Sequence, residues 1–337
     1  MKAIVLSGKG QAAWTDFPEP TMGEDCVKIK VAYCGLCGTD FHKFAGCPGS
    51  RPVVYPVPLG HEISGTVVAV GAAVKHFRVG DRVTADPNWH CGKCYYCRKG
   101  LTHLCTASRG VVKGMAEYIC PPEENVYHLP DALPLDRAAL TEPLSCCLHG
   151  LDLLDAHSGE TVAVIGMGAI GTMMVELIRH TCGVGPIVID VDESKRDAAM
   201  RLGASRFICS ASEDAAALLA DTPVERVLEC VGLPVTAELA FAVAGRGATV
   251  VLFGVGGKDA VARFPLYDAF SKEIVVKTSY INPGTTGRAI AMLASGAYDT
   301  DGWISAVIAP EEVPAELAQP TLSRHGKVLV CVDGTQE

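Results

Sequence analysis

The sequence predicts an α/β protein built from a small, barrel-like β domain and a doubly wound parallel sheet. Two observations carry this prediction. Up to about residue 145, short apolar or alternating segments are separated by glycine and proline, a pattern typical of compact all-β domains. Over residues 160–283, continuous apolar strands alternate with helical patterns, which is typical of a parallel sheet covered by helices. The length of 337 residues and the 49% hydrophobic content provide material for two domains with a large core.

Charge and cysteine usage exclude several classes of protein. The net charge of −9 argues against a surface that binds nucleic acid or anionic membranes. The N-terminus has only four apolar residues before polar ones, too few for a signal-peptide core, and no apolar run is long enough for a spanning helix. Fifteen cysteines, an odd number without a secretory signal, indicate reduced thiols, metal binding and a cytoplasmic location.

Three segments predict strands of the β domain. Residues 27–31 alternate apolar and polar, residues 63–70 are apolar and rich in β-branched side chains, and residues 79–83 form a turn that leads into a strand.

Possible metal ligands lie between the first two of these strands. The chain reads Cys-Gly-Leu-Cys-Gly-Thr-Asp-Phe-His over 34–42 and Gly-His-Glu over 60–62. Thiolate, imidazole and carboxylate are ligands that zinc accepts. Cys37 and His61 are too far apart for one zinc knuckle, so folding must bring them together, and three protein ligands would leave a fourth position open for catalysis. The alternative is a buried cysteine and a hydrogen-bonded core histidine.

A second group of cysteines has the spacing of a closed zinc site. Cys91, Cys94 and Cys97 are followed by Cys105, and four thiolates at these intervals can surround one tetrahedral zinc ion with no open position. The basic residues Lys93, Arg98 and Lys99 would favour the thiolate forms. The alternatives are a [4Fe–4S] cluster and a reduced loop without metal.

Residues 161–171 have the pattern of a dinucleotide-binding turn. An apolar strand at 161–165 runs into Gly-Met-Gly-Ala-Ile-Gly at 166–171, and a helical pattern follows over 172–180. The second strand, 186–190, ends in Asp190, which can accept hydrogen bonds from the adenosine ribose of NAD. Alternatively, Asp190 caps the helix that starts near Glu193. Further parallel strands are expected at 226–232, 248–254 and 274–279.

The tail completes the predicted organisation. It contains a helix at 288–294 and a final strand at 327–330, and is too short for a core of its own. We expect it to return to the first domain and close the cleft between the two. The predicted domains are therefore 1–145 with 284–337, carrying a cysteine lobe at 88–107, and the nucleotide domain 146–283.

Together these motifs resemble, across nearly the whole chain, the zinc-dependent medium-chain alcohol dehydrogenase/reductase family, in its polyol (sorbitol-like) branch. The segments that carry the resemblance are 35–40, 60–62, 91–105, 141–144, 166–171 and Asp190. It implies a GroES-like catalytic domain, a Rossmann domain, two zinc ions and NAD, and a homodimer or homotetramer. It also makes Cys37, His61 and Glu142 ligands of the catalytic zinc, with Glu62 as a transient ligand. Glutamate at 142, where other branches carry cysteine, favours polyols, with threonine dehydrogenases as close neighbours.

The resemblance also assigns cofactor-binding residues. These are Gly166, Gly168, Ala169, Ile170, Gly171, Asp190 and Arg196.

The expected chemistry is oxidation of a secondary alcohol. Zinc stabilises the alkoxide, and hydride passes to the nicotinamide. The proton leaves through Thr39 and the cofactor ribose to His42, unless His42 is merely a surface residue. The expected substrate is a neutral polyol, sugar alcohol or cyclic polyol. The alternatives are a polyol phosphate, L-threonine, a metal-free quinone or enone reductase of the same fold, and a catalytically dead zinc-stabilised binding protein.

Two features bear on the substrate pocket. Gly-Met-Ala at 114–116 stands where the family usually has Gly-Gly-x-Ala, on the route to the cleft, so the pocket shape is expected to differ. Basic residues in loops (Lys43, Arg51, Arg109 and Lys113) are placed where they can rim the cleft and hold a phosphate. Because such residues usually face water, a neutral substrate is the expectation.

Overall fold

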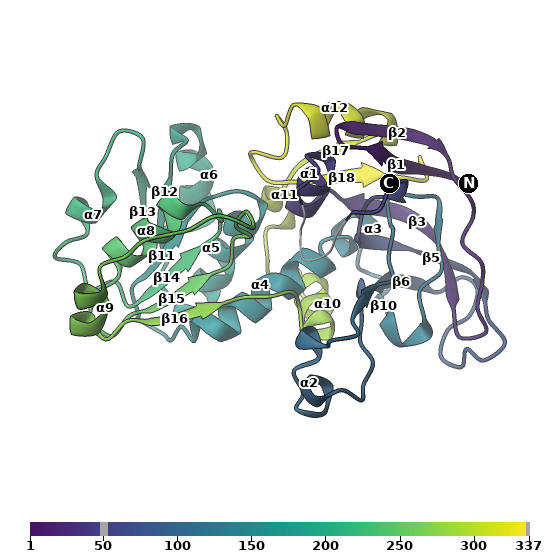
Figure 1. The fold of residues 1–337 in the computed structure, drawn as a ribbon, viewed down its shortest axis with the longest axis horizontal. Helices are drawn as coiled ribbons and strands as arrows, with labels where there is room; N and C mark the ends of the chain where they lie inside the picture. Colours follow the sequence, from purple (N-terminus) through teal and green to yellow (C-terminus); the bar gives the residue numbers. More distant parts are fainter. Residues whose placement is uncertain (48–52, 335–337) are drawn as a thin grey trace.

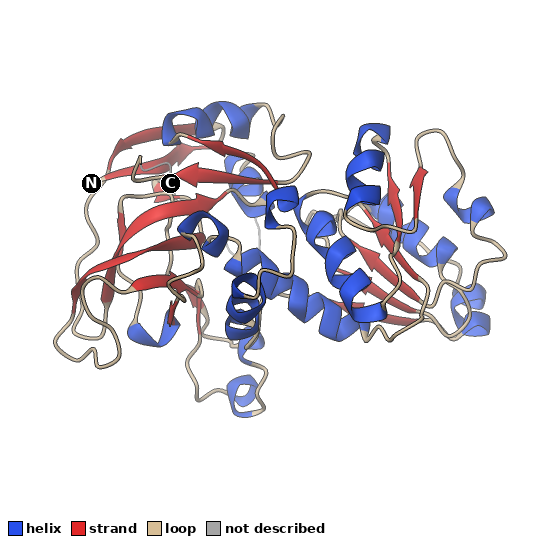
Figure 2. Ribbon diagram, turned by 180° about the vertical axis from the view of Figure 1, so that it is seen from behind, coloured by secondary structure: helices blue, strands red, loops and turns tan. Residues whose placement is uncertain are grey.

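The computed structural model describes residues 1–47 and 53–334 and shows two domains side by side. Helix α4 (Thr141–Leu154) runs between them, and both chain ends lie on the β domain (Figure 1). Figure 2 shows the same arrangement from behind, with helices around the parallel sheet and further helices beside the strands of the β domain. Within the described residues, no helix combines the length and the apolar character needed to cross a membrane.

The β domain is built on a seven-stranded sheet of order β10-β6-β5-β3-β18-β17, with β9 also paired to β3. Its strands are β3 (Val27–Gly35), β5 (Glu62–Val70), β6 (Arg82–Ala85), β9 (Tyr118–Ile119), β10 (Val126–His128), β17 (Ile304–Ile308) and β18 (Lys327–Cys331). The predicted strands at 27–31, 63–70 and near 79–83 correspond to β3, β5 and β6. Strand β3 extends to Gly35, beyond the predicted end at residue 31. Its second half is buried on both faces, so apolar and polar residues do not alternate there and the pattern did not indicate a strand.

A smaller sheet covers one side of this domain. It has the order β2-β1-β4, from β1 (Lys2–Gly8), β2 (Gln11–Asp16) and β4 (Val57–Pro58).

The second domain is a six-stranded, all-parallel sheet of order β13-β12-β11-β14-β15-β16. The strands are β11 (Val162–Ile165), β12 (Ile187–Asp190), β13 (Arg206–Cys209), β14 (Arg226–Glu229), β15 (Thr249–Leu252) and β16 (Val275–Thr278). Its main helices are α5 (Ala169–Cys182), α6 (Arg196–Arg201), α7 (Ala215–Leu218), α8 (Pro234–Val243) and α9 (Leu266–Lys272). The predicted fold class is confirmed. The strand order reverses beside β11, which is where open α/β sheets bind ligands.

The tail rejoins the first domain. Helix α10 (Thr286–Ala294) is followed by α11 (Thr300–Trp303), β17, α12 (Val313–Ala318) and β18. Strand β18 pairs antiparallel with β3, placing Leu329 opposite Gly35 and Val330 opposite Cys34. The end of the chain therefore lies against the strand that leads into the first metal motif.

Candidate active site and metal centres

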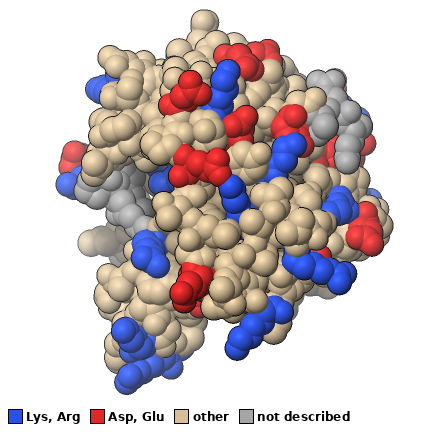
Figure 3. Space-filling view, turned by 90° about the vertical axis from the view of Figure 1, so that its right-hand side faces the viewer, with Lys and Arg blue, Asp and Glu red and all other residues tan. Residues whose placement is uncertain are grey.

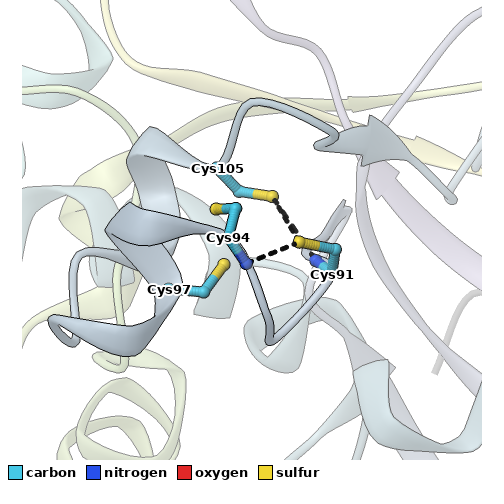
Figure 4. Close-up of side chains that lie close together, drawn as sticks. All are labelled: Cys91, Cys94, Cys97 and Cys105. Carbon is cyan, nitrogen blue, oxygen red and sulfur yellow. Dashed lines mark hydrogen bonds between the residues drawn. The ribbon is translucent and has the colours of Figure 1, made fainter.

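The four predicted cysteines of the lobe converge on one point (Figure 4). They come from the loop after β7 (Asn88–Trp89), from α2 (Tyr95–Arg98) and from the end of a 3₁₀ turn at Thr102–Leu104. Their sulfurs lie within 4.8 Å of one another, and Cys105 Sγ is 3.5 Å from Cys91 Sγ. Sulfurs at the corners of a tetrahedron with zinc–sulfur bonds of about 2.3 Å would be about 3.8 Å apart. This donor set therefore fits a closed zinc site.

Backbone amides prepare one of these thiols to bind a cation. Hydrogen bonds from the amides of Cys97 and Thr106 lower the pKa of Cys94 to about 6. The thiolate is the form that binds metal.

The first metal motif is assembled by the ladder between β3 and β5. Ligand atoms of Cys37, His61 and Glu62 lie within 4.8 Å of one another. Cys37 follows the end of β3, and Glu62 begins β5. Because these strands are antiparallel and Gly35 pairs with Glu62, the end of one motif meets the start of the other. Folding brings the two motifs together as the sequence predicted.

Asp40 joins the two ligand segments, a role that we did not predict. Its carboxylate is fully buried and accepts hydrogen bonds from the amide of Cys37 at 3.1 Å and the amide of Gly60 at 3.3 Å. One carboxylate thus holds both the Cys37 turn and the residue before His61. The signal in the sequence was an acidic residue just after the cysteine motif, in helix α1 (Gly38–Phe44).

Glu62 meets a buried cation from the far end of the chain. Its Oε1 is 2.7 Å from Lys327 Nζ, which also donates to the carbonyl of Leu36 at 3.2 Å. Its Oε2 is buried and has no hydrogen-bond partner within the part of the chain that the structure describes. A lone buried carboxylate oxygen beside a thiol and an imidazole is a group that a metal cation would satisfy.

Glu142 lies in the first turn of α4, buried, and outside the group of three ligand atoms within 4.8 Å. Its Oε1 accepts a weak hydrogen bond from Cys146 Sγ at 3.5 Å. Burial, reinforced by the charges of Glu62 and Cys37, raises the pKa of Glu142 to about 8, although His61 opposes the shift. Burial likewise raises the pKa of Cys37 to about 12. Several acidic groups thus share a dry site, and a bound cation would stabilise their charged forms.

The predicted proton-relay residues lie on α1, directly after Cys37. Thr39 is exposed and His42 is half-buried. Being three residues apart, they occupy the same side of the helix. This placement is compatible with the relay, which stays a prediction.

The glycine turn has the geometry of a phosphate-binding loop. Gly166 adopts φ of +90°, which favours glycine, and a Cβ on Gly171 would lie 1.9 Å from Gly166 O. A Cβ on Gly168 would meet no atom within 4 Å, so the space before α5 is open. Ala169 and Ile170 form the first turn of α5. Amides at this helix N-terminus can bind a pyrophosphate.

Asp190 ends β12 beside this loop. Its Oδ2 accepts from the amide of Met167 at 2.7 Å and lies 3.0 Å from Lys195 Nζ. The residue that caps the following 3₁₀ turn is Asp192 rather than Asp190, because the Asp192 carboxylate accepts a hydrogen bond from the amide of Ser194.

Arg196 has other partners. Its guanidinium pairs with Glu193 and donates to the carbonyl of Phe207 at 2.9 Å. In this structure Lys195, rather than Arg196, contacts Asp190.

The segment at 114–116, whose sequence differs from the usual family pattern, lies against the residues that precede His61. The amides of Gly114 and Met115 donate to the carbonyls of Gly60 and Leu59 at 2.9 and 3.0 Å, and Met115 is fully buried. The sequence of this segment therefore affects the position of the loop that carries His61.

The basic residues are spread over different elements. Lys43 lies on α1, half-buried, and Lys113 is exposed. Arg109 stacks over the ring of Trp89 at 4.4 Å, between β7 and β8 (Arg109–Gly110). Arg51 lies outside the described residues.

Comparisons with known proteins agree with this architecture. The model of the alcohol dehydrogenase GroES-like domain matches residues 23–131, and that of the zinc-binding dehydrogenase matches residues 169–295. The chain is 32% identical over 313 residues to sorbitol dehydrogenase from Bacillus subtilis, covering 89% of this chain and 88% of that protein. It is 33% identical over 326 residues to D-arabitol-phosphate dehydrogenase from Enterococcus avium, covering 90% of each.

A solved structure is similar over almost the full length. It is a protein from Sinorhizobium meliloti described as a zinc-binding dehydrogenase and bound to NADP, with a TM-score of 0.90, 33% identity and 98% coverage of both chains. Matching family models, motifs, fold and relatives lead to one conclusion. The chain belongs to the zinc-dependent medium-chain alcohol dehydrogenase/reductase family, in its polyol (sorbitol-like) branch.

Proposed function

We propose that this oxidoreductase oxidises a secondary hydroxyl of a neutral polyol to the ketone, using NAD and two zinc ions, one in each site. The observation that carries the proposal is the convergence of Cys37, His61 and Glu62 beside Glu142, where Glu62 Oε2 has no hydrogen-bond partner among residues 1–47 and 53–334. The sorbitol dehydrogenase relative supports the substrate class. The same donor atoms argue against a metal-free reductase.

Each group has a stated role. Cys37, His61 and Glu142 would hold the zinc ion, which would supply Lewis-acid stabilisation of the substrate alkoxide. The glycine turn and Asp190 would hold NAD, which would supply the hydride acceptor. Thr39 hydrogen-bonds the substrate hydroxyl and hands on its proton, and His42 passes that proton to water. Zinc in the cysteine lobe, in contrast, would stabilise the fold.

NAD rather than NADP is proposed from Asp190. A 2′-phosphate about 4 Å from this carboxylate would be repelled by roughly 4 kcal/mol at an effective dielectric constant of 20. The ion pair with Lys195 reduces that repulsion, and the NADP-bound relative shows the other choice within the fold. Equal kcat/KM with the two cofactors would refute the assignment of Asp190 to the ribose.

A neutral substrate is proposed because isolated basic residues at a surface usually face water. Lys43 and Arg109 lie on separate elements, and Arg109 is occupied by Trp89. The D-arabitol-phosphate dehydrogenase relative is the observation in favour of a phosphorylated polyol.

The test is a screen with NAD of sugar alcohols, inositols, polyol phosphates and threonine. Each polyol is compared with its phosphate in wild-type and Lys43→Ala protein at two salt concentrations. A preference for the neutral compound supports the proposal. A phosphate preference of about tenfold that Lys43→Ala and salt both remove would overturn it. Absence of turnover with every secondary alcohol would favour a catalytically dead binding protein.

We also propose a homodimer formed through the outer edge of the parallel sheet. Strand β16 is the last strand in the sheet order and exposes Val276, and the adjacent α9 exposes Tyr267 and Phe270 by 77% and 82%. Exposed apolar side chains next to an unpaired strand edge are often covered by a partner. Tyr267→Glu should therefore yield monomers by light scattering, whereas monomeric wild-type protein would refute this interface.

Surface charge and the state of the cysteines bear on nucleic-acid binding and on the location of the protein. Figure 3 shows acidic and basic side chains interspersed over much of the β-domain face that it draws, and the net charge of −9 argues against a nucleic-acid surface. All fifteen cysteines are free thiols, which supports a cytoplasmic location.

A further inference from the structure

A buried lysine from the last strand lies beside the proposed catalytic metal site. The Lys327 side chain is only 3% exposed and that of Glu62 only 1%, with 2.7 Å between Nζ and Oε1. The Lys327 ammonium also donates to the carbonyl of Leu36 at 3.2 Å, so both hydrogen-bond partners of Nζ are buried beside the site. Lys327 and Glu62 form an ion pair that is shielded from water.

The fold makes room for this pair at Gly35. A Cβ at this position would lie 1.9 Å from Glu62 Oε2, so only glycine admits the carboxylate in its present place. The neighbouring carbonyl of Leu36 accepts a second hydrogen bond from Lys327. The amide of Leu36 in turn donates to Val328 O at 2.9 Å, which ties β18 to the same point. The arrangement holds both members of the pair in a single orientation.

The two carboxylate oxygens of Glu62 are consequently different. Oε1 accepts a hydrogen bond from the ammonium, whereas Oε2 has no hydrogen-bond partner among the described residues, and Glu62 is grouped with Cys37 and His61. A carboxylate paired with an ammonium donates less charge to a cation than a free one. Without the lysine, Glu62 would be a buried, uncompensated anion, and such a group strongly favours a cation beside it.

We propose that Lys327 is a positioning residue whose ammonium pairs with Glu62 and holds this carboxylate beside the metal ligands. Because the paired carboxylate donates less charge, the site binds its metal less tightly than its donor atoms allow. The inference rests on the proposed catalytic zinc. According to this inference, a residue of β18 controls the affinity of the site for its metal. A merely structural lysine would affect folding instead.

The test follows metal release from full-length protein loaded with zinc, using a chelating dye. Two phases are expected, one for each site, and the cysteine lobe serves as an internal control. Lys327→Met should release the active-site metal about tenfold more slowly, with the lobe phase unchanged. Lys327→Arg should restore the wild-type rate. Lys30→Met, which removes an exposed lysine 3.9 Å from Asp333, is the matched control and should change neither phase.

Two further measurements separate positioning from structure. The slowing caused by Lys327→Met should disappear in a Glu62→Gln background, because the carboxylate that gains freedom is then absent. With cobalt in place of zinc, Lys327→Met should change the visible absorption of the active-site metal, since the freed carboxylate of Glu62 would then be able to bind it.

The results that overturn the inference are equally defined. They are an unchanged or faster active-site phase in folded Lys327→Met, or a slowing that persists with Glu62→Gln. Lys327→Gln keeps an N–H donor for Leu36 O while removing the charge, so an unchanged rate in this variant refutes the proposal even if the methionine variant does not fold. Wild-type protein that binds only the lobe metal would refute the proposed function, whereas two metals without a Lys327 effect would refute this inference alone.

Discussion

Replacing Asp40 with alanine should loosen both ligand segments of the active site. The carboxylate is fully buried and accepts two amide hydrogen bonds, from Cys37 at 3.1 Å and Gly60 at 3.3 Å. A hydrogen bond to a charged group contributes about 1.5–3 kcal/mol, and a buried amide left without a partner costs about 1–3 kcal/mol. After allowing for the carboxylate that no longer needs desolvation, we expect a loss of roughly 3–5 kcal/mol, a large part of a typical folding stability of about 5–15 kcal/mol.

Urea unfolding of the β domain and zinc retention are the two assays. Asp40→Ala should lower the unfolding free energy by the stated amount and release the active-site metal faster, because the Cys37 and His61 segments lose their shared anchor. Asp40→Asn, which keeps one acceptor oxygen, should cost about half as much. Asp131→Ala, at an exposed position, is the control and should change stability by less than about 0.5 kcal/mol. A loss below about 1 kcal/mol for Asp40→Ala would show that these two hydrogen bonds do not hold the site.

Three further predictions concern the metals, the cofactor and pH. Elemental analysis should find two zinc ions per chain. Cys37→Ser should abolish activity in a folded protein. Cys94→Ser should instead damage folding, because structural zinc contributes on the order of 10 kcal/mol in small metal-bound lobes. One metal per chain, or iron in the lobe, would contradict this. Asp190→Ser should reduce the preference for NAD over NADP by about tenfold or more, measured as the ratio of kcat/KM values; an unchanged ratio would remove Asp190 from cofactor selection. In metal-free protein, burial raises the pKa of Glu142 from 4.5 to about 8, so the folded chain retains a proton that the unfolded chain releases; this contribution to stability is full below pH 4.5 and is lost as the pH rises to about 8. Urea midpoints of the metal-free protein should fall across this range and fall less in Glu142→Gln, and equal slopes in the two proteins would argue against a raised pKa.

The local patterns of this chain were sufficient for its fold class and most of its donor atoms. The strand and glycine turn at 161–171 are readable because a buried parallel strand is continuously apolar and the turn must fit Gly171 against Gly166. The cysteine lobe can be predicted because its four cysteines lie within 15 residues, from Cys91 to Cys105, and local chain geometry brings their sulfurs together. The resemblance then added Glu142 and the function class, which spacing alone does not provide.

Strands with weaker patterns were not predicted. Strand β13 and strand β17 are short edge strands, and β17 is half-exposed along most of its length, so neither shows a continuous apolar run or a clear alternation. Their positions follow from pairing with β12 and β18, which are far from them in sequence or separated by helices.

What the sequence by itself determined were therefore the residues whose chemistry or spacing is local: the thiols, the imidazole, the glycine turn and Asp190. Only the tertiary structure decided which charged groups meet around them. Lys327 reads as the first residue of an apolar strand, yet the ladder between β18 and β3 buries it against Glu62. Asp40 reads as an ordinary residue of a short helix, yet it joins two segments through its carboxylate. Such pairings depend on strand register and burial across long separations, and those are set by packing of the whole domain rather than by neighbours in the chain.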